Sequence, residues 1–112
     1  VKIPDRVKVG PFEYTILQST RAMDDYNWEN QTSYSGVARH SDLQIIISER
    51  KAPSKHKETL VHELVHAVFS TYDLHERTAV EHFVEGFAVA LMDTVQRNPE
   101  LVAYVMDGVS DG

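Results

Sequence analysis

The spacing of apolar residues changes at Pro53, and this change divides the chain into two kinds of secondary structure. Before Pro53, polar and apolar residues alternate in short runs, which is the period of strands. After Pro53, apolar residues recur at three- and four-residue intervals, which is the period of amphipathic helices. A chain of 112 residues supports one hydrophobic core. We therefore expect a single α+β domain over residues 1–112, with a small antiparallel or mixed sheet packed on two long helices.

Two hairpins are expected in the first half of the chain. Residues 6–18 alternate on both sides of Gly10 and Pro11, a pair that favours a turn. Residues 34–39 and 43–48 flank a second turn, and three consecutive isoleucines in the later segment are typical of a buried strand. The segment between the hairpins carries the only tryptophan and is expected to form a loop or a short helix over the core.

Three helices are expected in the second half. The first spans about 54–72 and has Ser54 as a suitable N-cap. The second spans about 76–97 and ends before Pro99, because proline disfavours helix at the residue that precedes it. A short third helix then runs over about 99–106, with the proline at its first position.

Charge and composition exclude several classes of protein. The 17 acidic and 11 basic side chains are dispersed and give a net charge of −6, whereas nucleic-acid binding requires a concentrated basic patch. The chain has no cysteine, so it offers neither disulfides nor thiolate metal ligands. It also contains no membrane-spanning run and no secretion signal. We expect a cytoplasmic protein with no nucleic-acid or membrane partner.

The segment H-E-L-V-H, residues 62–66, places chemically active side chains within the first long helix. Because residues advance by about 100° on a helix, His62 and His66 lie about 40° apart, with Glu63 about 60–100° from them. The apolar stripe of the helix lies on the other side, and the small residues Thr59 and Ser70 lie near the histidines. Two imidazoles one turn apart, beside a carboxylate that does not bind the same ion, are typical of a zinc site.

The offset of Glu63 from the two histidines suggests its role. It lies too far around the helix to bind the same ion comfortably, yet close enough to reach a water molecule on that ion. Zinc lowers the pKa of such a water toward about 7, and a nearby carboxylate can take its proton and pass it to a leaving amine. The pattern therefore predicts zinc-dependent hydrolysis of a peptide bond, with Glu63 as the catalytic residue and His62 and His66 as metal ligands.

A catalytic zinc ion needs a third protein ligand. A metzincin would require glycine and histidine where this chain has Phe69 and Tyr72, and a deformylase-type cysteine is absent. A glutamate on the following helix remains, and we favour Glu85 over Glu81 because its helical neighbours are largely apolar, so that a buried carboxylate there would require a cation. Weaker alternatives for the third ligand are Glu81, His82 and His75, and His82 is also an alternative for a supporting or substrate-facing position.

The H-E-L-V-H segment, followed 19 residues after His66 by Glu85, resembles the gluzincin arrangement, in which the third ligand is a glutamate on the next helix. More narrowly, K-E-T-L-V-H-E-L-V-H-A followed by V-E-G-F-A resembles the ImmA/IrrE family of small zinc peptidases and its phage-encoded relatives. The resemblance implies a minimal zincin fold, one Zn²⁺ per chain, a phage or bacterial source, and a protein substrate of regulatory type, such as a repressor. It covers residues 57–91, and the chain departs from the usual E-A-N-x-F-A of the family, where it has E-G-F-A-V-A.

In zincin folds an edge strand runs beside the active-site helix, and the substrate backbone adds to it as a further strand. Either residues 34–39 or residues 43–48 could supply that strand. Peptidases of this kind often stabilise the oxyanion with a tyrosine or histidine. The possible residues are Tyr34, Tyr72, His40, His75 and His82.

The leading hypothesis is thus a zinc metallopeptidase of gluzincin type, and two alternatives from other classes stay open. In one, the chain binds zinc but is catalytically inactive and serves as a protein-interaction domain, with a protein group such as His82 closing the fourth metal position. In the other, no metal binds and the histidines are incidental. Metal content and coordination number distinguish the three.

Overall fold

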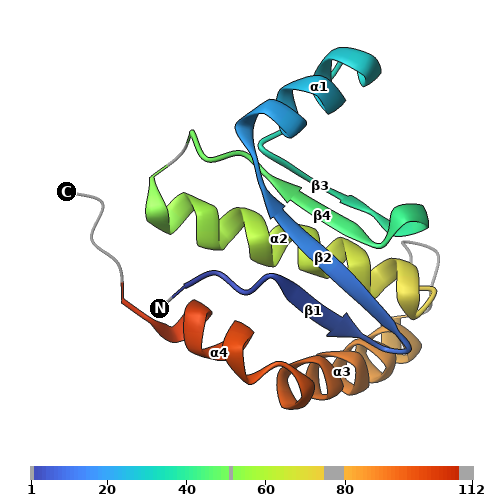
Figure 1. Cartoon of the computed structure of the whole chain (residues 1–112). Helices are drawn as coiled ribbons and strands as arrows, with labels where there is room; N and C mark the ends of the chain where they lie inside the picture. Colours follow the sequence, from blue (N-terminus) through green and yellow to red (C-terminus); the bar gives the residue numbers. More distant parts are fainter. Residues whose placement is uncertain (1, 51, 75–79, 109–112) are drawn as a thin grey trace.

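The computed structural model describes residues 2–50, 52–74 and 80–108. The described elements follow the order β1 (Arg6–Val9), β2 (Phe12–Gln18), α1 (Thr20–Asn30), β3 (Gly36–Arg39), the 3₁₀ turn η1 (His40–Asp42), β4 (Gln44–Ile47), α2 (Pro53–Thr71), α3 (Val80–Arg97) and α4 (Pro99–Met106). A mixed sheet packs against the helices, so the predicted α+β class is confirmed (Figure 1).

The sheet combines the two hairpins through a parallel contact. Its strand order is β1-β2-β4-β3. Strands β1 and β2 are antiparallel, as are β3 and β4, whereas β2 and β4 run parallel with Ile16 beside Ile45. Strand β3 therefore lies at one edge, and β4 lies inside the sheet. Of the two segments that could have been the edge strand beside the active-site helix, the structure places the earlier one at the edge.

The turn of the first hairpin requires glycine at position 10. Gly10 has a φ of 57°, in the left-handed region that side chains with a Cβ rarely adopt. A Cβ at this position would also lie 2.7 Å from Cγ2 of Thr71, at the end of α2. The turn of the hairpin thus packs directly on the C-terminal end of the long helix.

Helix α1 occupies the segment that was expected to form a loop or a short helix. Ser19 caps its start, since the Ser19 hydroxyl accepts a hydrogen bond of 3.0 Å from the backbone N–H of Ala22. Gln31 ends it in the left-handed conformation and donates its N–H to the carbonyl of Asn27. Only Met23 is buried in this helix, and much of α1 projects beyond the sheet (Figure 1).

Helix α2 begins at Pro53, and the prediction that Ser54 is its N-cap is wrong. Ala52 takes the N-cap position in an extended conformation, and its carbonyl accepts the N–H groups of Lys55 and His56. Proline suits the first helical position because it has no N–H to satisfy there and its φ is already helical. The observed N-cap thus lies two residues before Ser54.

The core lies between the sheet and α2, and α3 and α4 close it beside β1 (Figure 1). Three phenylalanine rings, those of Phe69, Phe83 and Phe87, hold the end of α2 against α3, with centroids 5.3–6.1 Å apart. None of the described helices combines the length and apolar character needed to cross a membrane. The buried core residues are Val7, Val9, Tyr14, Ile16, Ile45, Ile47, Leu60, Ala67, Val68, Ala90, Leu101 and Tyr104.

Asn98, between α3 and α4, covers the outer edge of β1. Its side-chain oxygen accepts the backbone N–H of Lys8 at 2.8 Å, and its amide nitrogen donates to the Lys8 carbonyl at 2.8 Å and to the Thr94 carbonyl at 2.7 Å. The side chain therefore imitates a neighbouring strand at one residue and satisfies backbone groups that an edge strand leaves unpaired. Asn98, at the break between α3 and α4, thus also anchors these helices to the sheet.

We predict that Asn98→Ala lowers the free energy of unfolding by about 1–3 kcal/mol, because it leaves partly buried backbone groups of Lys8 without partners. Urea denaturation measures this change. The matched control is Gln96→Ala at an exposed position of α3, where a change below about 0.5 kcal/mol is expected. Equal effects of the two substitutions would contradict the bridging role of Asn98.

Candidate metal site

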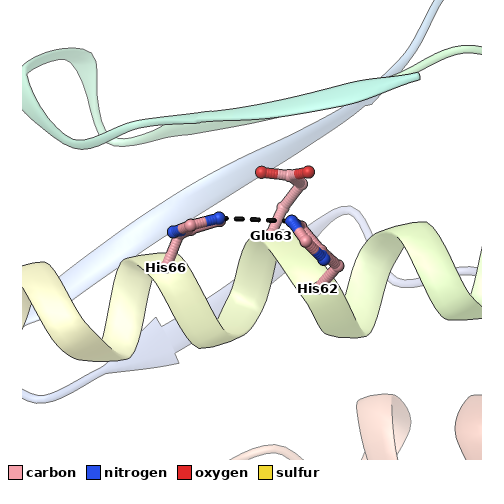
Figure 2. Close-up of side chains that lie close together, drawn as sticks. All are labelled: His62, Glu63 and His66. Carbon is pink, nitrogen blue, oxygen red and sulfur yellow. Dashed lines mark hydrogen bonds between the residues drawn. The ribbon is translucent and has the colours of Figure 1, made fainter. Parts of the chain in front are cut away.

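His62, Glu63 and His66 form a compact group on one side of α2, as Figure 2 shows. One potential ligand atom from each residue can be chosen so that all three lie within 4.8 Å of one another. The two histidine side chains are exposed, whereas Glu63 is buried. All three side chains project toward the sheet, where the nearest strand in the view is β3. The sequence placed these residues on one helix correctly, but it did not anticipate the burial of the glutamate.

The spacing of the imidazoles suits a single zinc ion. The Nε2 atoms of His62 and His66 lie 3.2 Å apart, in the contact drawn as a dashed line in Figure 2. Two nitrogens at about 2.0–2.1 Å from one zinc ion in tetrahedral geometry lie about 3.3 Å apart. The donor set of two imidazoles beside a carboxylate is also one that zinc accepts readily. The group therefore fits this metal in both distance and chemistry.

Glu63 lies in surroundings that raise its proton affinity. Its exposed fraction is 7%, and this burial raises the pKa of its carboxyl group above the usual range. Positive charge on His62 and His66 acts in the opposite direction, as does a hydrogen bond from the backbone of Ala38 in β3. A carboxylate with a raised pKa is better matched to accepting and returning a proton near neutral pH.

Gly36, at the start of β3, allows the strand to approach α2 closely. A Cβ on this residue would lie 2.6 Å from Cγ2 of Thr59 and 3.2 Å from both Cγ of Glu63 and the carbonyl oxygen of Ile46. Such distances leave no room for a side chain. Sequence reasoning missed Gly36, although a single glycine inside a strand pattern is a known signal of close backbone approach.

A small pocket of about 200 Å³ opens beside the group, between the residues that lead into β3 and the middle of α2. Tyr34 lies on its wall with His62 and Glu63. The other residues considered for the oxyanion lie elsewhere: the His40 ring bonds to the Tyr14 hydroxyl, and the Tyr72 hydroxyl donates to Asp93. His82 is on α3, and His75 lies outside the described residues. Tyr34 is thus the one described residue of that set that shares this pocket.

The residues expected to supply a third ligand lie on α3. Glu85, Glu81 and His82 are all exposed, and within the described ranges none of them joins the group on α2. The apolar neighbours expected around Glu85 are present, but they face solvent, with Val89 59% and Met92 58% exposed. The buried face of α3 instead carries the phenylalanines, Ala90 and Thr94.

We predict that Gly36→Ala lowers the free energy of unfolding by about 1–3 kcal/mol, because the added methyl group would overlap the Thr59 methyl group and crowd Glu63 and the Ile46 carbonyl. Urea denaturation tests this. The control is Gly108→Ala, because no atom lies within 4 Å of a Cβ built there, and a change below about 0.5 kcal/mol is expected. A stable Gly36→Ala variant would show that this contact does not constrain the strand.

A comparison with models of protein families identifies a match that includes the His62–Glu63–His66 group. The family model of peptidase M78, described as the IrrE N-terminal-like domain, matches residues 24–93. The match covers more than half of the chain and includes the H-E-L-V-H segment. No curated protein and no solved structure matches significantly. The chain therefore belongs to the peptidase M78 family as an IrrE N-terminal-like domain, a membership that, with the His62–Glu63–His66 group, indicates a zinc-dependent metallopeptidase acting on protein.

Proposed function

We propose that the 112 residues form one metallopeptidase domain in which His62 and His66 bind a catalytic zinc ion and Glu63 acts as the general base. The observation that carries this proposal is the separation of 3.2 Å between the two Nε2 atoms, with a buried carboxylate beside them. Family membership supports the same reading. The zinc ion, when bound, would polarise the scissile carbonyl and lower the pKa of a water molecule toward about 7.

Glu63 carries out the proton transfers. Its carboxylate takes a proton from the attacking water as the new carbon–oxygen bond forms, and then gives that proton to the amine as the carbon–nitrogen bond breaks. Burial and the hydrogen bond from Ala38 hold the carboxylate in one place, so that little ordering is needed when the substrate binds. The hydroxyl of Tyr34, in the same pocket, is the proposed donor to the oxyanion.

Strand β3 is the proposed backbone-binding edge. It is the edge strand of the sheet nearest the group, and it pairs with β4 on its inner side only. An extended substrate segment could add to its outer side and lie across the pocket beside His62. We propose a regulatory protein such as a repressor as the substrate and the cytoplasm as the location, both on the basis of the family resemblance.

Glu85 is the proposed third ligand. Its spacing from H-E-L-V-H supports this, as does the exposed apolar face of α3 around it, which includes Val84, Val89 and Met92. Bringing Glu85 to the histidines would require α3 to rotate, which would bury part of this apolar face but would break the packing of Phe83 and Phe87 on Phe69. Glu81 is the proposed alternative, with His82 in a supporting role.

We predict that Glu63→Gln retains zinc while hydrolysis falls by about 10²–10⁴-fold, because an amide cannot accept the proton. Purified protein would be assayed for zinc by elemental analysis and for cleavage of random octapeptide pools by mass spectrometry. His62→Ala should lose the zinc, and Glu100→Gln on α4 is the control that should keep both properties. Zinc without hydrolysis in the unsubstituted protein would favour the inactive interaction domain, and full activity of Glu63→Gln would refute the role of this residue.

The choice of third ligand is tested separately. We expect Glu85→Ala to weaken zinc binding by at least about tenfold, because metal sites lose affinity strongly when a ligand is removed. Glu81→Ala, one helical turn away and also exposed, should change the affinity little. Competition titration with a zinc chelator measures both. Equal losses, or a larger loss in Glu81→Ala, would overturn the assignment of Glu85.

A further inference from the structure

A larger hollow lies next to the small pocket at His62 and Glu63. It has a volume of about 820 Å³ and lies between α1, the segment that follows it, and the residues after β4. Tyr34 and Ser35 line both hollows, so the two adjoin at this point. The residues that matter for its chemistry are Met23, Asp24, Asn27, Trp28, Tyr34 and Arg50.

The wall of this hollow is held in place by Asn27. The side-chain oxygen of Asn27 accepts hydrogen bonds from the Thr32 hydroxyl at 2.8 Å and from the Tyr34 backbone N–H at 3.0 Å. Its amide nitrogen donates to the Tyr34 carbonyl at 2.9 Å. One side chain thus fixes the path of the chain between α1 and β3, and a preformed wall costs little entropy when a ligand binds.

The charges in the hollow cancel each other. The two terminal guanidinium nitrogens of Arg50 donate to the carboxylate of Asp24, at 2.6 and 2.7 Å. No other charged side chain lines the hollow in the described part of the chain. The floor includes Met23, which is buried, and the rim includes two aromatic residues. The remaining lining is uncharged and polar, and it includes Gln31, Thr32, Ser33, Ser35 and Ser48. An uncharged group whose apolar part contacts the two aromatic residues is therefore the favoured occupant.

Trp28 is the most exposed large apolar residue among those described, with 87% of its surface open to solvent, and Tyr34 beside the same hollow is 57% exposed. Tryptophan and tyrosine on a concave surface are the residue types that most often dominate binding energy. The backbone that leads into β3 passes directly through Tyr34 and Ser35. A peptide paired with the outer edge of β3 and extended past its first residue would pass Tyr34, which lines the hollow.

We propose that this hollow is a specificity pocket, in which Trp28 and Tyr34 receive an aromatic or long aliphatic side chain of the protein substrate near its scissile bond. This inference rests on the proposed function, because it takes its occupant from the chain that is cleaved at the neighbouring site. Trp28 would act in binding and selection, and the proton transfers would remain with Glu63.

The test uses zinc-loaded Glu63→Gln protein, so that binding is measured without cleavage. The probes are octapeptide pools that lack tryptophan and carry Phe, Leu, Ser or Glu at one fixed central position. We expect the Phe and Leu pools to bind about tenfold more tightly than the other two. Trp28→Ala in the same background should remove this preference, Trp28→Phe should keep most of it, and Met106→Ala, at an exposed apolar residue of α4, should leave it unchanged.

Because the chain has a single tryptophan, its fluorescence provides a second measurement of peptide binding. Binding of the Phe pool should shift the Trp28 emission to shorter wavelength and reduce its quenching by acrylamide, because the indole ring leaves water. Equal binding of all four pools, no binding of any pool, an unchanged preference in Trp28→Ala, or an unchanged Trp28 emission would each overturn the proposal.

Measurements of zinc and cleavage on the unsubstituted protein distinguish an error in the proposed pocket from an error in the proposed function. Zinc and cleavage of the pools, without dependence on Trp28, would refute the pocket alone. Absence of zinc and cleavage, with binding that still depends on Trp28, would refute the peptidase assignment and support the hollow as a peptide-binding site.

Discussion

The close contact between β3 and α2 is the constraint on which the site depends. A glycine at position 36 lets the strand lie against the helix at distances that exclude any side chain. This contact buries Glu63 and places the Ala38 backbone where it can donate to the Glu63 carboxylate. The two histidines, one position before and three positions after the glutamate, remain open to solvent. One packing contact therefore fixes a buried carboxylate beside two accessible imidazoles, the arrangement on which the proposed function rests.

The two edge strands of the sheet, β1 and β3, have different neighbours. At β1, the Asn98 side chain occupies the outer hydrogen-bonding groups of Lys8, and helix α3 packs against the strand. At β3, the strand lies beside the His62–Glu63–His66 group and the small pocket. Covering one edge lowers the risk of pairing with other chains, whereas the other edge is the one proposed to bind an extended substrate. The asymmetry of the sheet thus agrees with a domain that acts on extended protein segments.

Helix α3 shows what a hydrophobic pattern predicts and what it leaves undecided. Its apolar residues cover most of the helix circumference, so the pattern predicts a helix but does not select one buried face. In the structure the phenylalanine rings and Ala90 select the face, because they pack on α2 and the sheet. Glu85 consequently lies on the other side, among exposed apolar residues. Because periodicity does not show which face of α3 packs on α2, it also does not show which side chain of α3 could be the third ligand.

The sequence by itself determined the types and order of most elements and the position of the H-E-L-V-H group. These follow from local rules: the period of apolar residues, the break at Pro99, and the fixed angle between neighbours on a helix. The N-cap of α2 was mispredicted even locally, because a proline at the first helical position outweighed the hydroxyl of Ser54. Only the tertiary structure decided the parallel pairing of β2 with β4, the edge position of β3, the burial of Glu63 and the hollow beside Tyr34. Each of these depends on contacts between residues distant in the chain, and a local pattern shows which face of an element is apolar without showing what will pack against it.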